Sequence, residues 1–180
     1  MEKDKARILV VDDEQSIREI ITRKLRSEGY SCVAATDGKD ALWKAFMRDF
    51  DVVLMDVKMP GLSGMQVLPK MVTDHPDTCV VMITAVCDVD TAVEAMKAGA
   101  YDYLTKPFNL DELVLKVDKA LEKRKLVREH REYQLRLEQK LKEKTNQVGQ
   151  RYERVAKATD REHAALARIE SGKPGERKES

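Results

Sequence analysis

Five short apolar runs recur along the first 104 residues, and they constrain the fold more than any other feature of the chain. The runs occupy residues 7–12, 30–35, 51–56, 79–84 and 100–104. The first and third runs have apolar residues at consecutive positions, which is typical of strands covered on both faces, as in parallel sheets. Between the runs, apolar residues recur at helical spacing, as at Ile17, Ile20 and Ile21. We expect helices at residues 14–27, 38–47, 63–72 and 91–97, and a last helix that begins at Asn109.

This alternation of strands and helices predicts an α/β fold, a doubly wound five-stranded parallel sheet. In such domains the functional groups lie at the carboxyl ends of the strands. Asp12 and Asp13 stand at the end of the first run, and Asp56 ends the third. Thr84 ends the fourth run, and Lys106 follows the fifth. We therefore expect these five side chains to meet at one edge of the sheet.

The chemistry of these five side chains fits phosphoryl transfer to a carboxylate. That reaction needs a nucleophilic aspartate, a divalent cation, and hydroxyl or cationic groups for the phosphoryl oxygens. Clustered carboxylates repel one another unless a cation lies among them, and oxygen ligands favour Mg²⁺ over Zn²⁺. Taken singly, an Asp-Asp pair is more often a helix cap and a lysine is more often a surface residue. Five such residues at strand ends favour the functional interpretation.

Charge divides the chain into two regions of opposite sign. Residues 1–120 contain 16 Lys and Arg against 21 Asp and Glu, a net charge of −5. Residues 121–180 contain 17 and 11, a net charge of +6. An acidic domain does not favour DNA binding, and the acids interleaved in the basic region weaken a nucleic-acid interpretation. We expect no DNA binding by this chain.

The second region cannot build a core of its own. Residues 122–180 include only nine Leu, Ile, Val, Met or Phe, so the region reads as an extension of the last helix. A seven-residue series forms one half of a coiled-coil seam: Leu113, Ala120, Val127, Gln134, Leu141, Val148 and Val155. The companion series is mostly polar, so a coiled coil and a single solvated helix remain the two alternatives. We expect a folded domain at 1–122, a helical extension at 123–170 and a disordered tail at 171–180.

Neither an export signal nor a membrane segment is predicted. The longest apolar stretch, 79–87, is too short to span a bilayer. Three cysteines, Cys32, Cys79 and Cys87, lack metal-binding spacing and read as free thiols in a reducing compartment. We expect a cytoplasmic protein with no membrane partner.

Four motifs make the chain resemble the receiver domains of two-component response regulators, which have the chemotaxis-regulator-like fold. The motifs are ILVVDDE from Ile8, DVVLMDVKMPG from Asp51, VMITA from Val81 and AYDYLTKPF from Ala100. The resemblance extends over residues 5 to about 122. The resemblance implies the flavodoxin-like strand order 2-1-3-4-5. It also implies a phosphorelay signalling role and Mg²⁺ as the cofactor.

The resemblance assigns roles to the residues of the motifs. It implies that Asp56 is the phosphoacceptor and that Asp13 and Asp56 bind Mg²⁺ together with the backbone carbonyl of Lys58. Asp12 is implied to help through a water molecule.

Three further roles follow from the same resemblance. Thr84 and Lys106 are implied to contact the phosphoryl oxygens. Tyr103 is the implied switch aromatic, which works together with Thr84. The bond between Lys106 and Pro107 is implied to be a cis peptide.

Two other classes of protein fail on specific residues. A dehalogenase-type phosphotransferase also uses an aspartate nucleophile and Mg²⁺, but it needs a second aspartate where Lys58 stands. A flavodoxin needs a loop rich in Ser, Thr and Gly after the first strand. Here the acids at 12–14 would repel a phosphate that lacks a cation.

Two interpretations of how the chain passes on a signal remain open. In the first, the chain receives a phosphoryl group from a sensor histidine kinase or a phosphotransfer protein and switches a protein-interaction surface. It would then promote only its own phosphorylation and dephosphorylation, and would pair with a second copy. The pairing surface would comprise the helix at 91–97, the strand at 100–104, the helix from Asn109 and its extension. In the second, the chain is the N-terminal part of a larger effector, a transcription factor or a His-Asp phosphodiesterase.

Overall fold

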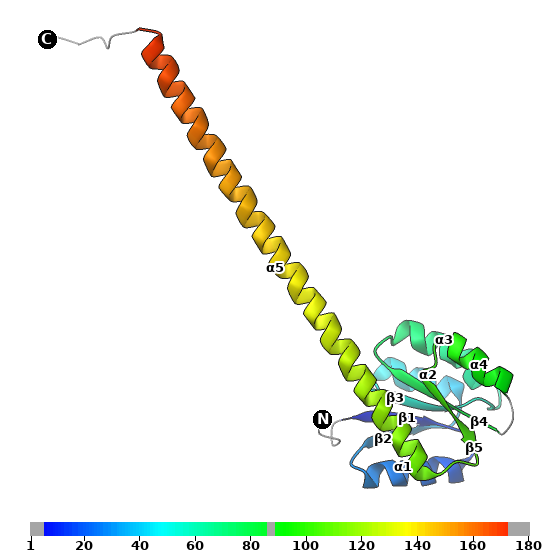
Figure 1. Cartoon of the computed structure of the whole chain (residues 1–180). Coiled ribbons are helices and arrows are strands. Elements are labelled where there is room, and N and C mark those ends of the chain that lie inside the picture. Colours follow the sequence, from blue (N-terminus) through cyan, green and yellow to red (C-terminus); the bar gives the residue numbers. More distant parts are fainter. Residues whose placement is uncertain (1–5, 86–88, 173–180) are drawn as a thin grey trace. The chain divides into compact units, whose positions relative to one another are not determined.

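The computed structural model describes residues 6–85 and 89–172, and its centre is a five-stranded parallel sheet. The strand order is β2-β1-β3-β4-β5, as Figure 1 shows. The strands are β1 (Arg7–Val11), β2 (Ser31–Ala35), β3 (Val52–Asp56), β4 (Cys79–Ala85) and β5 (Asp102–Lys106). This order and the parallel pairing confirm the predicted doubly wound, flavodoxin-like fold.

Helices cover both faces of the sheet. They are α1 (Gln15–Ser27), α2 (Gly38–Met47), α3 (Gly64–Asp74), α4 (Val89–Lys97) and α5 (Leu110–Glu170). In Figure 1, α1 and the first part of α5 lie on one face, and α2, α3 and α4 lie on the other. Crossovers of one hand between parallel strands place helices on both faces in this way.

The apolar strands form two cores, one on each face of the sheet. Ile8 and Val10 of β1 pack in the core under α1 and α5, together with Leu113. Leu9 and Val11 pack in the core under α2, α3 and α4. All four β1 residues are fully buried, and full burial of such side chains contributes roughly 1.5–3 kcal/mol each. Because its side chains fill both cores, β1 does not alternate between apolar and polar residues.

Strand β5 begins two residues later than the expected range of 100–104. Gly99 has a positive φ of 100°, and the Ala100 N–H bonds back to the carbonyl of Ala95 at 3.0 Å, which ends α4. The first link to the sheet is the Tyr101 N–H to the carbonyl of Val80 at 2.7 Å. This delay makes Lys106 the last residue of the strand instead of the second residue after it. Helix α4 also begins earlier than expected, at residue 89 instead of 91.

Contacts divide the chain into two units, Met1–Glu129 and His130–Ser180. The last buried side chain of α5 is that of Leu121. The domain boundary that the sequence predicts after residue 122 remains a prediction. Ser171 and Gly172 form a turn, and residues 173–180 of the predicted disordered tail lie outside the described part. No helix in the described ranges is both long and apolar enough to cross a membrane.

Arg124 anchors α5 at the sheet edge where the strands begin. Its Nε donates to the carbonyl of Asp77 at 2.6 Å, and its guanidinium lies 2.6 Å from Asp51 Oδ1. The other carboxylate oxygen of Asp51 accepts from the Arg7 N–H at 2.6 Å. One side chain therefore ties the helix to the starts of β1 and β3 and to the turn before β4. Charge-assisted hydrogen bonds of this kind are stronger than neutral ones.

Candidate functional site

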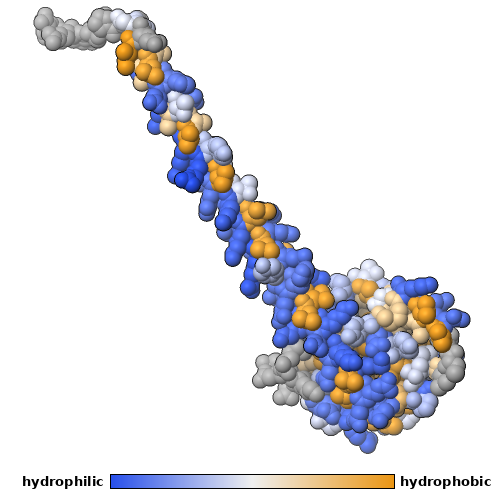
Figure 2. Space-filling view, in the orientation of Figure 1, coloured by the Kyte–Doolittle hydropathy of each residue, from blue (hydrophilic) through white to orange (hydrophobic). Residues whose placement is uncertain are grey.

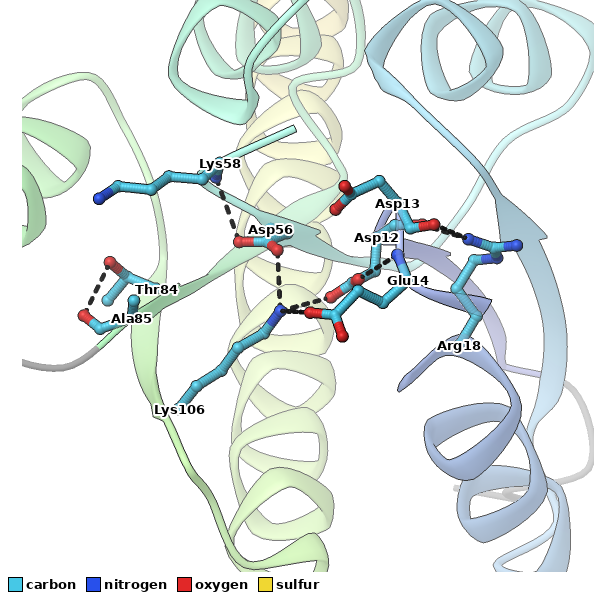
Figure 3. Close-up of polar contacts among 9 residues, drawn as sticks. All are labelled: Asp12, Asp13, Glu14, Arg18, Asp56, Lys58, Thr84, Ala85 and Lys106. Atoms are coloured by element: carbon cyan, nitrogen blue, oxygen red, sulfur yellow. Dashed lines mark hydrogen bonds and ion pairs between the residues drawn. The ribbon is translucent and has the colours of Figure 1, made fainter. Parts of the chain in front are cut away.

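Three carboxylates meet at the carboxyl ends of β1 and β3. These strands are neighbours, and their register pairs Val11 with Met55, so the residues that follow lie side by side. Asp12 is fully buried, Asp56 is 5% exposed, and Asp13 is exposed. One carboxylate oxygen from each of the three residues lies within 4.8 Å of the corresponding oxygens of the other two. Figure 3 shows the three side chains gathered at this edge. The structure therefore brings together the three acids that sequence reasoning placed at this edge.

Lys106 joins two of these acids from the end of β5. Its Nζ lies 2.8 Å from Asp12 Oδ2 and 2.8 Å from Asp56 Oδ2. Glu14 is a more distant partner, with its Oε1 3.9 Å from the ammonium. Because β4 lies between β3 and β5, only a long side chain can reach across to the acids. The ammonium neutralises part of the charge that the cluster would otherwise hold.

Burial and the ion pairs shift the pKa values of Asp56 and Lys106 in opposite directions. Burial raises the pKa of Asp56, and the hydrogen bond and charge of Lys106 lower it only in part, so the pKa lies above its usual value. Burial lowers the pKa of Lys106, but hydrogen bonds to Asp12 and Asp56 outweigh that effect and raise it overall. The lysine therefore stays charged beside a carboxylate that water solvates poorly.

The loop after β1 is held by the first turns of α1. Asp12 Oδ1 accepts from the Glu14 N–H at 2.9 Å. Arg18 donates through its guanidinium to the carbonyls of Asp12 at 2.7 Å and Asp13 at 2.9 Å. Sequence reasoning missed Arg18, because a contact with backbone carbonyls leaves no signature in residue spacing. Its effect is to fix the backbone that carries both acids.

The loop after β3 and the start of α3 both lie against Asp56. The Lys58 N–H donates to Asp56 Oδ1 at 3.2 Å, while the Lys58 side chain points away from the acids in Figure 3. A Cβ at Gly64 would lie 2.1 Å from the carbonyl oxygen of Asp56. Helix α3 can therefore begin here only because position 64 has no side chain. The Lys58 carbonyl as a metal ligand remains a prediction.

Thr84 and Tyr103 are not gathered with the acids. The Thr84 hydroxyl lies 3.4 Å from the carbonyl of Ala85, apart from the pair of Asp56 and Lys106 in Figure 3. Tyr103 is 41% exposed, and the Lys116 ammonium lies 5.8 Å from its ring centroid. The peptide bond between Lys106 and Pro107 is cis. The switch roles of Thr84 and Tyr103 remain predictions.

The fold and the site together define a receiver-type α/β domain, with acids at the ends of β1 and β3 and a lysine at the end of β5. Residues 8–118 match the family model described as the response regulator receiver domain. The chain belongs to this family. Receiver domains bind Mg²⁺ through acidic residues, and the cluster of Asp12, Asp13 and Asp56 provides such residues here.

Curated relatives match the same part of the chain. Regulatory protein AtoC of Escherichia coli (strain K12) is 41% identical over 125 residues, which are 69% of this chain and 27% of AtoC. Nitrogen assimilation regulatory protein NtrX of Azorhizobium caulinodans is 41% identical over 127 residues, 69% of this chain and 28% of NtrX. The chain therefore matches only about a quarter of the length of these relatives.

Two solved structures that are matched over almost their whole length share the fold of this part of the chain. A response regulator receiver domain protein from Clostridium thermocellum is 35% identical, with a TM-score of 0.65, and the match covers 68% of this chain and 98% of that one. A CheY-like receiver domain protein from Methanospirillum hungatei JF-1 is 30% identical, also with a TM-score of 0.65, over 67% of this chain and 96% of that one.

Proposed function

We propose that this chain is a phosphoacceptor response regulator that receives a phosphoryl group on Asp56 from a sensor histidine kinase or a phosphotransfer protein. The observation that carries the proposal is the placement of the Asp56 carboxylate. It ends the central strand, lies among two further acids and is held by the Lys106 ammonium at 2.8 Å. A carboxylate with adjacent cation ligands and a fixed ammonium has the groups that phosphoryl transfer to aspartate needs.

The proposed reaction forms one bond and breaks one bond. A carboxylate oxygen of Asp56 attacks phosphorus, and the bond from phosphorus to the donor nitrogen or oxygen breaks, with its electron pair leaving on the donor. Lys106 and, after rotation of its hydroxyl, Thr84 contact the phosphoryl oxygens. Asp13, Asp56 and the Lys58 carbonyl, with Asp12 through water, would hold Mg²⁺, which offsets charge on those oxygens. The chain acts on its own side chain only, so we propose that it has no further enzymatic activity.

The direct test is labelling with acetyl phosphate. In the presence of Mg²⁺, intact-mass measurement should show one phosphoryl group added per chain, because a single acceptor is proposed. With EDTA in excess the addition should fall to background. Absence of labelling in Mg²⁺, with the fold intact by circular dichroism, would contradict the proposal.

Mg²⁺ should also stabilise the fold before any phosphorylation, because three carboxylates and one bridging ammonium leave an excess of negative charge. A ligand that binds only the native state adds about 2.7 kcal/mol to the free energy of unfolding at a hundredfold excess over its Kd. Asp13→Asn should reduce this gain and leave metal-free stability equal or higher, since it removes repulsion. Urea denaturation with Mg²⁺ and with EDTA measures both quantities.

The matched control is Asp49→Asn, which removes an exposed acid outside the cluster and should leave the Mg²⁺ response unchanged. A metal-free Asp13→Asn protein that is much less stable than wild type would show that Asp13 supports the fold in another way.

We propose that phosphorylation acts through the face formed by α4, β5 and the first part of α5. This face presents exposed apolar side chains: Val89, Val93, Met96, Tyr103 and Leu115. Attraction of the Thr84 hydroxyl to the phosphoryl group would leave space for Tyr103 and repack the face. A second copy of the chain is a proposed partner, both through this face and through the remainder of α5.

The second candidate is the regulatory part of a longer transcriptional regulator. The match to only about a quarter of AtoC and NtrX supports it. An open reading frame that continues past residue 180 into a domain with its own core would decide for this candidate. DNA binding would then belong to that domain.

A further inference from the structure

The second unit carries an exposed stripe along one side of α5. The stripe consists of Leu141, Thr145, Val148, Tyr152, Val155, Thr159, Glu162 and Leu166. Their spacing alternates between four and three residues, which is the spacing of a coiled-coil seam. Figure 2 shows hydrophobic side chains recurring along this helix between hydrophilic ones. Every described side chain from residue 130 to residue 169 is exposed, so no described part of the chain covers the stripe.

The two threonines belong to the stripe despite their hydroxyl groups. Thr145 Oγ1 donates to the carbonyl of Leu141 at 2.9 Å, and Thr159 Oγ1 donates to the carbonyl of Val155 at 3.0 Å. Both hydroxyls are therefore satisfied within the helix, and burial of these residues would leave no unpaired donor. Only Glu162 brings a charge into the stripe.

We propose that this stripe pairs with the same stripe of a second copy in antiparallel orientation, centred between Glu153 and Arg154. The inference deepens the self-association included in the proposed function and rests on it for the identity of the partner. It does not depend on phosphorylation. Two identical helices paired in this way are related by a two-fold axis, so the contact is closed and involves two chains.

Side-chain size favours the antiparallel orientation. Reversal about this centre places Leu141 opposite Leu166 of the second copy, Val148 opposite Thr159, and Tyr152 opposite Val155. The large tyrosine then faces a small residue, which suits a packed seam. A parallel pair in register would place the two Tyr152 side chains opposite each other at its centre.

Charge favours the same orientation. In a parallel pair, Glu162 faces Glu162 of the second copy, and two like charges in a seam repel each other. In the antiparallel pair, Glu162 lies opposite Thr145 and near Lys144, which precedes it. Residues 130–152 carry six bases and three acids, whereas residues 153–170 carry four of each. Antiparallel pairing therefore places the basic residues 130–152 of one copy beside the neutral residues 153–170 of the other. Parallel pairing would place the two basic segments beside each other.

Small residues flank the stripe near its centre. Gly149 and Ala156 lie next to it on one side and face each other across the antiparallel pair. Nothing lies within 4 Å of a Cβ built at Gly149, so the helix itself does not require glycine there. Glycine inside a helix costs about 1 kcal/mol relative to alanine. A close approach of the second helix at this position accounts for a residue that the isolated helix does not favour.

The first test compares two substitutions by sedimentation equilibrium of the full chain. Val148→Glu places a charge in the seam and should raise the dimer Kd at least about tenfold, a change of about 1.4 kcal/mol. Gln150→Glu adds a negative charge at an exposed position on the opposite side of the helix and should leave the Kd within about twofold. A wild-type chain that stays monomeric, or equal effects of the two variants, would overturn the proposal.

The second test determines the orientation through charge. Glu162→Lys should weaken pairing because it places two bases together with Lys144 of the second copy. Adding Lys144→Glu should restore the wild-type Kd to within about threefold, since the exchange re-forms an opposite pair. In a parallel pair these two positions do not meet, so the absence of rescue would contradict the orientation.

A distance measurement gives an independent readout. Spin labels at Gln139→Cys, in a chain with its native cysteines replaced by alanine, should lie about 44 Å apart along an antiparallel pair, from 1.5 Å per residue. In a parallel pair in register, both labels lie at the same level of two helices whose axes are about 10 Å apart. The distance between the labels would then be much shorter than in the antiparallel pair. A dominant short distance would overturn the proposal.

Labelling of the same proteins with acetyl phosphate separates this inference from the proposed function. Seam variants should still accept one phosphoryl group, because the stripe and Asp56 lie in different units. A chain that forms dimers but accepts no phosphoryl group from acetyl phosphate would contradict the phosphoacceptor proposal alone. Phosphorylation without pairing would contradict the seam alone.

Discussion

The Asp56→Asn variant should accept no phosphoryl group from acetyl phosphate, whereas the wild-type chain should accept one. The amide lacks the charged oxygen that attacks phosphorus, and it has nearly the same shape as the carboxylate. Removing a covalent nucleophile eliminates the reaction pathway, so the expected loss is complete within the background of intact-mass measurement. The variant should also remain folded, because asparagine can still accept a hydrogen bond from Lys106.

Two controls make this result specific. Asp49→Asn, at an exposed position outside the cluster, should label like wild type. Thermal denaturation should show that Asp56→Asn is folded under the labelling conditions. Persistent labelling of Asp56→Asn at one phosphoryl group per chain would identify another residue as the acceptor and refute the assignment.

The Lys106→Ala variant should lose about 3 kcal/mol of free energy of unfolding when metal is absent. The Lys106 ammonium contacts both Asp12 and Asp56, whose side chains are 0% and 8% exposed. Its removal leaves two buried charges without their shared partner, and such a loss costs more than the intact pair contributes. Urea denaturation in EDTA measures the difference.

Mg²⁺ should return part of that stability, because a divalent cation can offset the same carboxylates. Lys116→Ala is the matched control, since Lys116 pairs with a single, more exposed acid, Asp102, at 2.7 Å. Its loss should cost at most about 1 kcal/mol, the usual range for surface pairs. Equal losses for Lys106→Ala and Lys116→Ala would show that the bridge does not stabilise the fold.

Residue pattern was sufficient to predict the sheet and the convergence of the acids. Strands that are apolar at consecutive positions require two covered faces, and parallel strands bring their carboxyl ends to one edge. The positions of Asp12 and Asp56 could be predicted without other information, because Asp12 directly follows such a strand and Asp56 ends one. The predicted start of β5 was wrong by two residues. Gly99 is in the left-handed region and the Ala100 N–H bonds to the end of α4, so the chain joins the sheet later than expected.

Contacts with the backbone could not be predicted in the same way. Arg18 holds two carbonyls of the loop after β1, and Arg124 holds the carbonyl of Asp77. A carbonyl is present at every position, so no residue type marks the partner of either arginine. Side-chain rotation has no sequence signature either, which is why the outward position of Tyr103 could only be seen in the structure.

The absence of a side chain at Gly64 limits how this protein can vary. A Cβ at this position would meet the carbonyl oxygen of Asp56 at 2.1 Å, so any other residue would displace α3 or the end of β3. The cost would fall on the position of Asp56, the proposed phosphoacceptor, although Gly64 itself has no reactive group. In a saturation mutagenesis screen that selects for signalling, position 64 would be nearly as intolerant as position 56. A search for essential residues by chemical type alone would overlook it.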